Sequence, residues 1–143
     1  MGNFDAFMKQ NKVVDNKEYE YAPTKSLLGQ DKKPIKWKFK KLPLEFYNRI
    51  KNEFTKTERV GDGKDMRYLP QLDSDGFNAT LIAESCIYPD LHDRALQESY
   101  GVNDANELLY AMVDNPGEYT DLVLFMQDMY GFGNNDMVKQ AKN

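Results

Sequence analysis

Few residues in this 143-residue chain could support covalent chemistry. It has one cysteine and one histidine, Cys86 and His92, and these two residue types can act together as nucleophile and base. Pro89 breaks the chain between them, and Cys86 lies in the apolar run 81–87, so a core cysteine and a surface histidine are favoured. No CxxC or histidine-rich spacing is present, which argues against zinc. We therefore predict a protein that is not an enzyme and has no catalytic residue, metal or cofactor.

Three acidic residues imitate the spacing of a calcium-binding loop. Asp73, Asp75 and Glu84 occupy its first, third and twelfth positions, and carboxylate oxygens at these positions would be suitable ligands. However, Phe77 stands at the fifth position and Asn78 replaces the glycine that the loop's turn requires. Helix capping by the two aspartates is the favoured interpretation.

Two basic features could meet phosphates. The run 61–64, Gly-Asp-Gly-Lys, lacks the length and ending of a phosphate-binding loop and is typical of a hairpin turn. Lys36, Lys38 and Lys40 alternate with apolar residues, so Trp37 lies on the opposite face of the strand and cannot stack bases beside them. A solvated strand face is favoured, and we predict no nucleic-acid partner.

The charges are divided unevenly along the chain. Residues 1–71 carry 16 Lys and Arg against 10 Asp and Glu, whereas residues 72–143 carry 3 against 13, so the two parts have net charges of +6 and −10. These parts could attract each other within one fold or between neighbouring copies, and the sequence leaves both arrangements open. No apolar run approaches the roughly 18 residues of a membrane span, and the N-terminus lacks a secretory signal pattern, so we expect no membrane association.

The elements that position these residues form one α+β domain, with an N-terminal antiparallel hairpin region packed on a mainly helical C-terminal half. Residues 18–21 and 35–40 alternate and predict the first hairpin, and residues 57–60 and 66–69 predict a weaker second hairpin. We divide the domain, residues 1–143, into a basic β-rich part (1–71), an acidic helical part (72–132) and a flexible tail (133–143), which has a possible last turn over 137–142.

Helices are predicted from apolar spacing and capping residues. A helix over 43–55 should pack on the first hairpin, and Phe4 to Met8 form a possible short amphipathic helix. We expect Ser74 or Asp75 to cap a helix that runs to about Ile87 and is closed by Pro89. Three more follow: a short helix from 90–93 to Gly101, one over 104–113 capped by Asn103, and one that begins at Asn115-Pro116 and stops at Gly131.

The last of these helices has more apolar surface than one core face needs. Residues 122–126 are five consecutive apolar residues, which cover well over half of the helix circumference. Either several elements surround this helix or part of it meets another chain. Under the second interpretation, the partner-binding residues are Leu124, Phe125, Met129, Tyr130 and Phe132.

The C-terminal half contains a series of short motifs. They are Ala83-Glu84-Ser85-Cys86-Ile87-Tyr88-Pro89-Asp90-Leu91, Leu96-Gln97-Glu98-Ser99-Tyr100-Gly101-Val102, Glu107-Leu108-Leu109, Pro116-Gly117-Glu118-Tyr119 and Tyr130-Gly131-Phe132. In order and spacing, this series resembles the XkdN-like phage tail assembly chaperones. The first half, with Trp37 and Phe39 ahead of a helix at Pro43, looks like the same family less distinctively.

The resemblance implies a bacteriophage or prophage protein of the host cytoplasm that coats the tape-measure protein. It would keep that long chain soluble during tail morphogenesis, until the tail tube polymerises. It also implies a possible homo-oligomer, a longer frameshifted form of which the ending 139–143 marks the short version, and no catalytic residues. The alternative is a structural tail completion or connector subunit of the virion, and a nucleic-acid-binding regulator ranks third.

Overall fold

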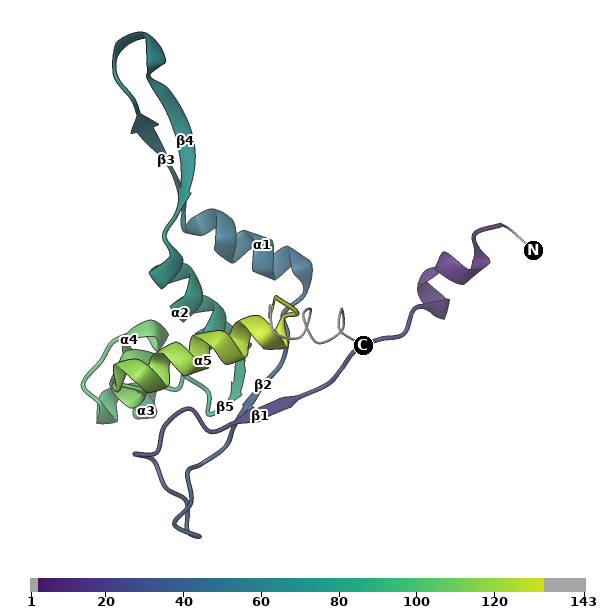
Figure 1. Cartoon of the computed structure of the whole chain (residues 1–143). Coiled ribbons are helices and arrows are strands. Elements are labelled where there is room, and N and C mark those ends of the chain that lie inside the picture. The colour runs from purple at the N-terminus through teal and green to yellow at the C-terminus, as the bar shows by residue number, and fades with distance from the viewer. Residues whose placement is uncertain (1–2, 133–143) are drawn as a thin grey trace, which may run out of the picture.

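The computed structural model describes residues 3–132 and has the expected α+β architecture (Figure 1). Strands β1 (Tyr19–Tyr21), β2 (Trp37–Phe39) and β5 (Cys86–Tyr88) form an antiparallel sheet in the order β1-β2-β5. Strands β3 (Thr55–Val60) and β4 (Arg67–Leu72) form a separate hairpin. The helices are α1 (Leu44–Glu53), α2 (Ser74–Ser85), α3 (Arg94–Ser99), α4 (Ala105–Met112) and α5 (Pro116–Met129).

The first predicted hairpin is confirmed. Tyr19 pairs with Phe39 and Tyr21 with Trp37, and the side chains of Trp37 and Phe39 are fully buried. The alternating lysines are exposed, as period two requires, so this sheet has one face in the core and one face in water.

The third strand was not predicted. We expected the helix that begins near residue 74 to continue to about Ile87, but α2 ends at Ser85 and Cys86 begins β5. Cys86 pairs with Phe39 and Tyr88 with Lys38, while Lys40 N–H donates to Ser85 C=O at 2.9 Å. Hydrogen bonds to the backbone of β2 therefore replace those that one further turn of α2 would make. This outcome depends on a strand distant in the sequence, so the local spacing of apolar residues could not predict it.

The second hairpin is longer than predicted, with six residues in each strand, and it projects from the body of the molecule (Figure 1). Its turn contains Gly61 and Gly63, both with positive φ, and the short 3-10 helix η3 (Gly63–Asp65). Asp73 N–H donates to Phe54 C=O at 2.7 Å and closes the base of the hairpin. Most side chains of the two strands are exposed, so the hairpin contributes little to the core.

Two helix caps lie one position or more from the predicted residue. Asp73, rather than Ser74 or Asp75, caps α2 by accepting from Gly76 N–H, and Asp104, rather than Asn103, caps α4 by accepting from Glu107 N–H. In both places adjacent residues can cap, and the structure selects the aspartate whose backbone is extended.

The cap of α5 is confirmed, with Asn115 accepting from Glu118 N–H at 3.1 Å and Pro116 in the first turn. The Glu118 carboxylate, however, accepts from Thr24 Oγ1 at 2.9 Å and from Lys25 N–H at 2.8 Å. Glu118 thus connects the segment after β1 to the start of α5.

One core joins both halves of the chain. Trp37 and Phe39 belong to the same buried cluster as Ile82 of α2 and Leu122 of α5. The apolar residues at helical spacing on α4 are all buried, namely Ala105, Leu108, Leu109 and Met112. Helix α1 was expected to pack mainly on the first hairpin, but its main partner is α2, which it contacts through Tyr47 and Phe77, whose ring centroids are 5.4 Å apart.

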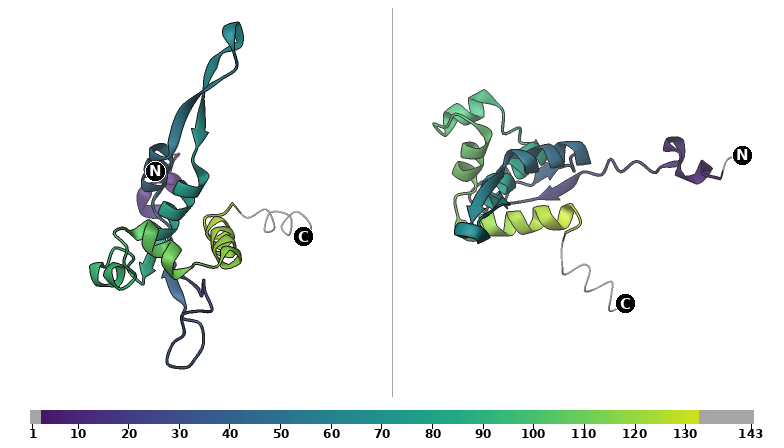
Figure 2. Two further views of the ribbon diagram at one scale, coloured as in Figure 1. Left: turned by 90° about the vertical axis from the view of Figure 1, so that its left-hand side faces the viewer. Right: turned by 90° about the horizontal axis from the view of Figure 1, so that it is seen from above.

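The N-terminal residues 3–17 extend away from the body (Figure 2). Instead of the predicted amphipathic helix over Phe4–Met8, the chain makes two short 3-10 turns, η1 (Asp5–Phe7) and η2 (Lys9–Asn11). The expectation of a flexible tail over 133–143 concerns residues outside the described part of the chain.

Candidate partner-binding site

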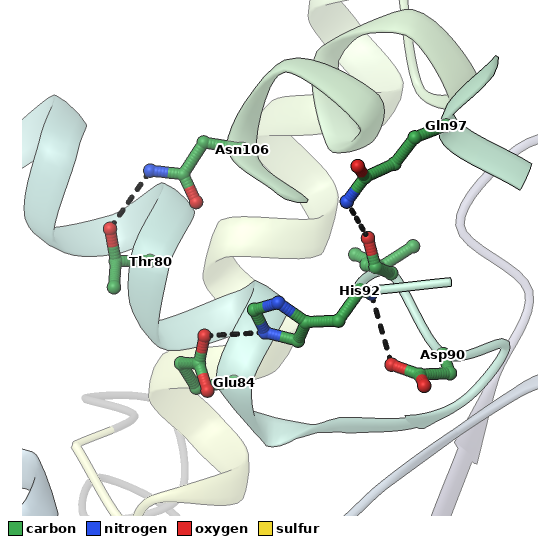
Figure 3. Close-up of polar contacts among 7 residues, drawn as sticks. Thr80, Glu84, Asp90, His92, Gln97 and Asn106 are labelled. Carbon is green, nitrogen blue, oxygen red and sulfur yellow. Dashed lines mark hydrogen bonds and ion pairs between the residues drawn. The ribbon is translucent and has the colours of Figure 1, made fainter. Parts of the chain in front are cut away.

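Cys86 and His92 do not form a catalytic pair. Cys86 is 7% exposed and donates from Sγ to Pro89 C=O at 3.2 Å, and burial raises the pKa of its thiol to about 12. His92 lies at the surface, where Nε2 is 2.7 Å from Oε1 of Glu84 (Figure 3). The Cys86 thiol is therefore protonated at neutral pH, and the His92 imidazole pairs with the Glu84 carboxylate and not with this thiol.

The polar contacts drawn in Figure 3 connect α2 with α4, and connect α2 and α3 with the loop after β5. Asn106 Nδ2 of α4 donates to Thr80 Oγ1 of α2 at 2.9 Å, and Gln97 Nε2 of α3 donates to Leu91 C=O at 2.9 Å. These bonds satisfy polar groups at or near the core, and their arrangement fits a structural role.

The calcium-like spacing is used for capping, as favoured above, since Asp73 caps α2 and Asp75 lies in its first turn. Within residues 3–132 no group of histidine, cysteine or acidic side chains is arranged to hold a metal ion. The run 61–64 lies at the tip of the projecting hairpin, in the turn that the sequence favoured.

The five residues predicted to bind a partner lie in three different environments. Leu124 and Phe132 are 56% and 57% exposed. Phe125 is half-buried against the first hairpin, with its ring 4.5 Å from that of Tyr21 and stacked on it. Met129 is 5% exposed and belongs to the core.

Tyr130, the fifth predicted residue, anchors the end of α5. Its hydroxyl accepts from Leu42 N–H at 2.8 Å and lies 2.7 Å from Ser85 Oγ. Burial raises the pKa of this phenol, so it stays neutral at physiological pH. One side chain therefore connects α5, the end of α2 and the segment after β2.

A groove lies beside Tyr130 between α1, α2 and α5. This cavity of about 200 Å³, hereafter the α5 groove, is lined by Tyr47, Phe77, Asn78, Leu81, Ile82, Val123, Met126, Gln127, Tyr130 and Phe132. Its lining is mostly apolar, and the rings of Tyr47 and Phe132 approach to 6.0 Å at one end. A groove of this chemistry can accept an apolar side chain from another segment.

Eight of the ten lining residues were not identified as site residues from the sequence, among them Tyr47, Phe77 and Val123. Tyr47 and Phe77 were predicted to lie on helix faces directed at the core, and Val123 was one residue of the apolar run. The sequence did contain a signal for Tyr47, because Phe46 and Tyr47 are adjacent aromatic residues. Adjacent residues point about 100° apart around a helix, so the two side chains cannot both face one neighbouring element. Phe46 is 48% exposed, whereas Tyr47 is half-buried.

The apolar circumference of α5 is thus divided among several neighbours. Leu122, Met126 and Met129 enter the core, Phe125 packs on β1 and β2, and Val123 faces the groove. Leu124 faces outward and does not line the groove. Of the predicted set, the structure brings together Tyr130 and Phe132 alone at this groove.

Among residues 3–132 no helix combines the length and the apolarity that a bilayer crossing requires.

Comparison with known sequences identifies a matching protein family. The model of a family described as phage XkdN-like tail assembly chaperone protein matches residues 4–142. The phage-like element PBSX protein XkdN of Bacillus subtilis (strain 168) is 26% identical over 141 residues, covering 96% of this chain and 93% of that protein.

The uncharacterized protein YqbN of the same strain is 24% identical over 141 residues, covering 96% of this chain and 92% of that protein. A crystal structure of the protein YqbN matches the fold with a TM-score of 0.72 and 21% sequence identity. It covers 92% of this chain and 98% of the YqbN chain. At this identity the structural similarity is evidence for the fold alone.

Proposed function

Because the chain belongs to the family of XkdN-like phage tail assembly chaperones, we propose that it binds the tape-measure protein and keeps it soluble during tail morphogenesis. It acts in the host cytoplasm by non-covalent binding, without catalysis. The observation that carries the proposal is the apolar α5 groove with exposed Phe132 at its rim. A groove between packed helices is a common receptor for the apolar face of an amphipathic helix.

The size of the groove determines what it can accept. A cavity of about 200 Å³ accommodates one or two large apolar side chains and is too small to enclose a helix. A helical client would therefore lie across the rim and insert an aliphatic or aromatic side chain between Tyr47, Val123 and Phe132. Such a contact is small, so each copy binds weakly and many copies along one client supply the total affinity.

Charge restricts the client further. Residues 72–132 carry twelve Asp and Glu against Arg94 as the one Lys or Arg. Because two of the three helices that form the groove, α2 and α5, belong to this acidic part, we expect client helices with lysine or arginine beside their apolar stripe to be favoured, mainly because opposite charge speeds encounter. Weak, salt-sensitive binding of this kind also permits release when the tail tube forms.

The proposal is tested by co-expression with a tape-measure fragment. Phe132→Asp places a charge at the exposed rim and should reduce the amount of soluble fragment at least several-fold. The reason is that a bound apolar side chain would bury the new carboxylate, which is unfavourable. Leu28→Asp is the matched control, since Leu28 is 52% exposed on the loop between β1 and β2 and should leave rescue unchanged.

Val123→Ser is a second groove variant that alters the lining without adding charge. Full rescue by both Phe132→Asp and Val123→Ser would refute the groove as the client site. Detection of the chain in purified particles by mass spectrometry would favour the structural tail subunit instead.

A further inference from the structure

The N-terminal arm, residues Asn3–Lys17, carries an unusual amount of exposed apolar surface. Phe4 is 71% exposed, Phe7 83% and Val13 89%, and Met8 and Val14 are also exposed. The Phe4 and Phe7 rings lie 6.5 Å apart on one short 3-10 turn and form a small aromatic pair. Water opposes this exposure, so a surface that covers the pair would be favoured.

The arm is fixed at its base and extends outward from there. Asp15 forms an ion pair with Lys41 at 3.3 Å, and the ammonium groups of Lys17 and Lys41 lie over the Tyr19 ring at 4.7 and 5.7 Å. Beyond this anchor the arm extends away from α1, α2 and α5 (Figure 1 and the right view of Figure 2). The aromatic pair is therefore directed away from the α5 groove of its own subunit.

The α5 groove offers an apolar surface of the kind that the arm, which extends away from its own subunit, could pack against. It is mostly apolar, has room for a phenyl ring, and nine of its ten lining residues belong to the acidic part of the chain. The arm carries Lys9, Lys12 and Lys17 against Asp5 and Asp15, which is a net charge of +1. The arm of one copy thus offers exposed aromatic rings to an apolar cavity of another copy, and the net charge of the arm is opposite to that of residues 72–132.

We propose that the N-terminal arm of one copy docks in the α5 groove of a second copy, with Phe7 or Phe4 inserted beside Phe132. The contact is heterologous, so each subunit offers one arm and one groove and copies can link head to tail. It covers the apolar groove when no client is present. A client that uses the same groove displaces the arm, and this last clause rests on the proposed function.

Docking is tested with two chains that each carry one new cysteine. One chain carries Gln10→Cys, on the exposed η2 turn three residues from Phe7, and the other, with a different tag, carries Asn78→Cys in the groove lining. A short bismaleimide should cross-link the mixture into a heterodimer. The native Cys86 should not interfere, since its thiol is buried and its pKa is raised, and the unsubstituted chain should yield no product.

The control mixture combines Gln10→Cys with Lys64→Cys, which places the second thiol at the tip of the projecting hairpin. We expect at least a fivefold smaller heterodimer yield from the control pair. Equal yields would mean collisional cross-linking and would overturn the proposal. A single chain with both Gln10→Cys and Asn78→Cys that cross-links internally in dilute solution would also overturn it, because the arm would then occupy its own groove.

Sedimentation velocity without client gives an independent readout. Phe4→Ser with Phe7→Ser should shift the self-associated species toward monomer, without change in helix content, because both side chains are exposed. An unchanged distribution would refute docking by the arm. A tape-measure fragment added to the cross-linking mixture separates the two proposals: persistent cross-linking contradicts a shared groove, whereas lost cross-linking supports displacement.

Discussion

At the scale of single residues, Tyr130 shows how a predicted contact residue also serves the fold. The sequence marks it as part of an apolar surface, and its ring does line the α5 groove. Its hydroxyl meets Leu42 N–H and Ser85 Oγ, and Ser85 is fully buried. The groove is therefore built on a side chain held by polar bonds at its far end, which fixes the position of its rim.

Tyr130→Phe removes both of these hydrogen bonds and leaves the ring in place. We expect the free energy of unfolding to fall by about 1–3 kcal/mol, because a buried hydroxyl and a backbone N–H lose their partner. Urea denaturation measures the change. Tyr68→Phe, at a position 63% exposed on β4, is the control and should change stability by less than about 0.5 kcal/mol. Equal effects of the two variants would contradict the role assigned to Tyr130.

At the scale of elements, the start of α2 is held by a close contact that only glycine allows. A Cβ atom built on Gly76 would lie 2.5 Å from Cε1 of Phe54 and 2.8 Å from Oδ2 of Asp73. Phe54 follows α1, and its carbonyl accepts from Asp73 N–H at the base of the projecting hairpin. The junction of α1, the hairpin and α2 thus depends on the absence of one methyl group.

Gly76→Ala should therefore destabilise the protein by about 1–3 kcal/mol, the usual cost of overpacking. The sign is informative, because glycine to alanine inside a helix otherwise stabilises by about 0.5–1 kcal/mol. Gly117→Ala in the first turn of α5 is the matched control, since its nearest atom would be Oδ1 of Asn115 at 3.3 Å. Thermal melts of both variants measure the difference, and a stabilised Gly76→Ala would show that Phe54 moves aside freely.

At the scale of the whole molecule, the basic and acidic parts share one core. Trp37 and Phe39 come from the first part, Ile82 and Leu122 from the second, and all four are essentially inaccessible to solvent. The ion pairs Asp15–Lys41, Glu84–His92 and Arg94–Glu98 each join residues of the same part. The parts are joined by apolar burial, by the pairing of β2 with β5, and by the hydrogen bonds of Glu118 to Thr24 and Lys25 and of Tyr130 to Leu42.

Urea unfolding should consequently follow a single transition. Trp37 is the one tryptophan in the sequence and reports on the first part by fluorescence, whereas circular dichroism at 222 nm reports mainly on the helices of the second part. The two midpoints should coincide within error, because both signals depend on the same core. Separate midpoints would show that the halves fold as independent units and would contradict the single domain predicted from the sequence.

Local patterns in the sequence were sufficient to predict several elements and the family. Alternation around Trp37 and Phe39 predicted the first hairpin, the glycines at 61 and 63 predicted the turn of the second, and Asn115-Pro116 predicted the start of α5. Each of these features depends on residues close in the chain, through side-chain period, positive φ or a cap. The motif series from Ala83 to Phe132 likewise predicted the family that the comparison confirms.

Other features were decided by residues distant in sequence. Pairing with the backbone of β2 made Cys86–Tyr88 a strand. The elements around α5 placed Phe125 against the first hairpin and Met129 in the core, and they left Leu124 exposed to water. The α5 groove needs α1, α2 and α5 side by side, and no local pattern encodes that proximity. Sequence alone showed that α5 has apolar residues around most of its circumference. Only the packed structure determined which of them remain accessible, because burial depends on what the rest of the chain places against each face.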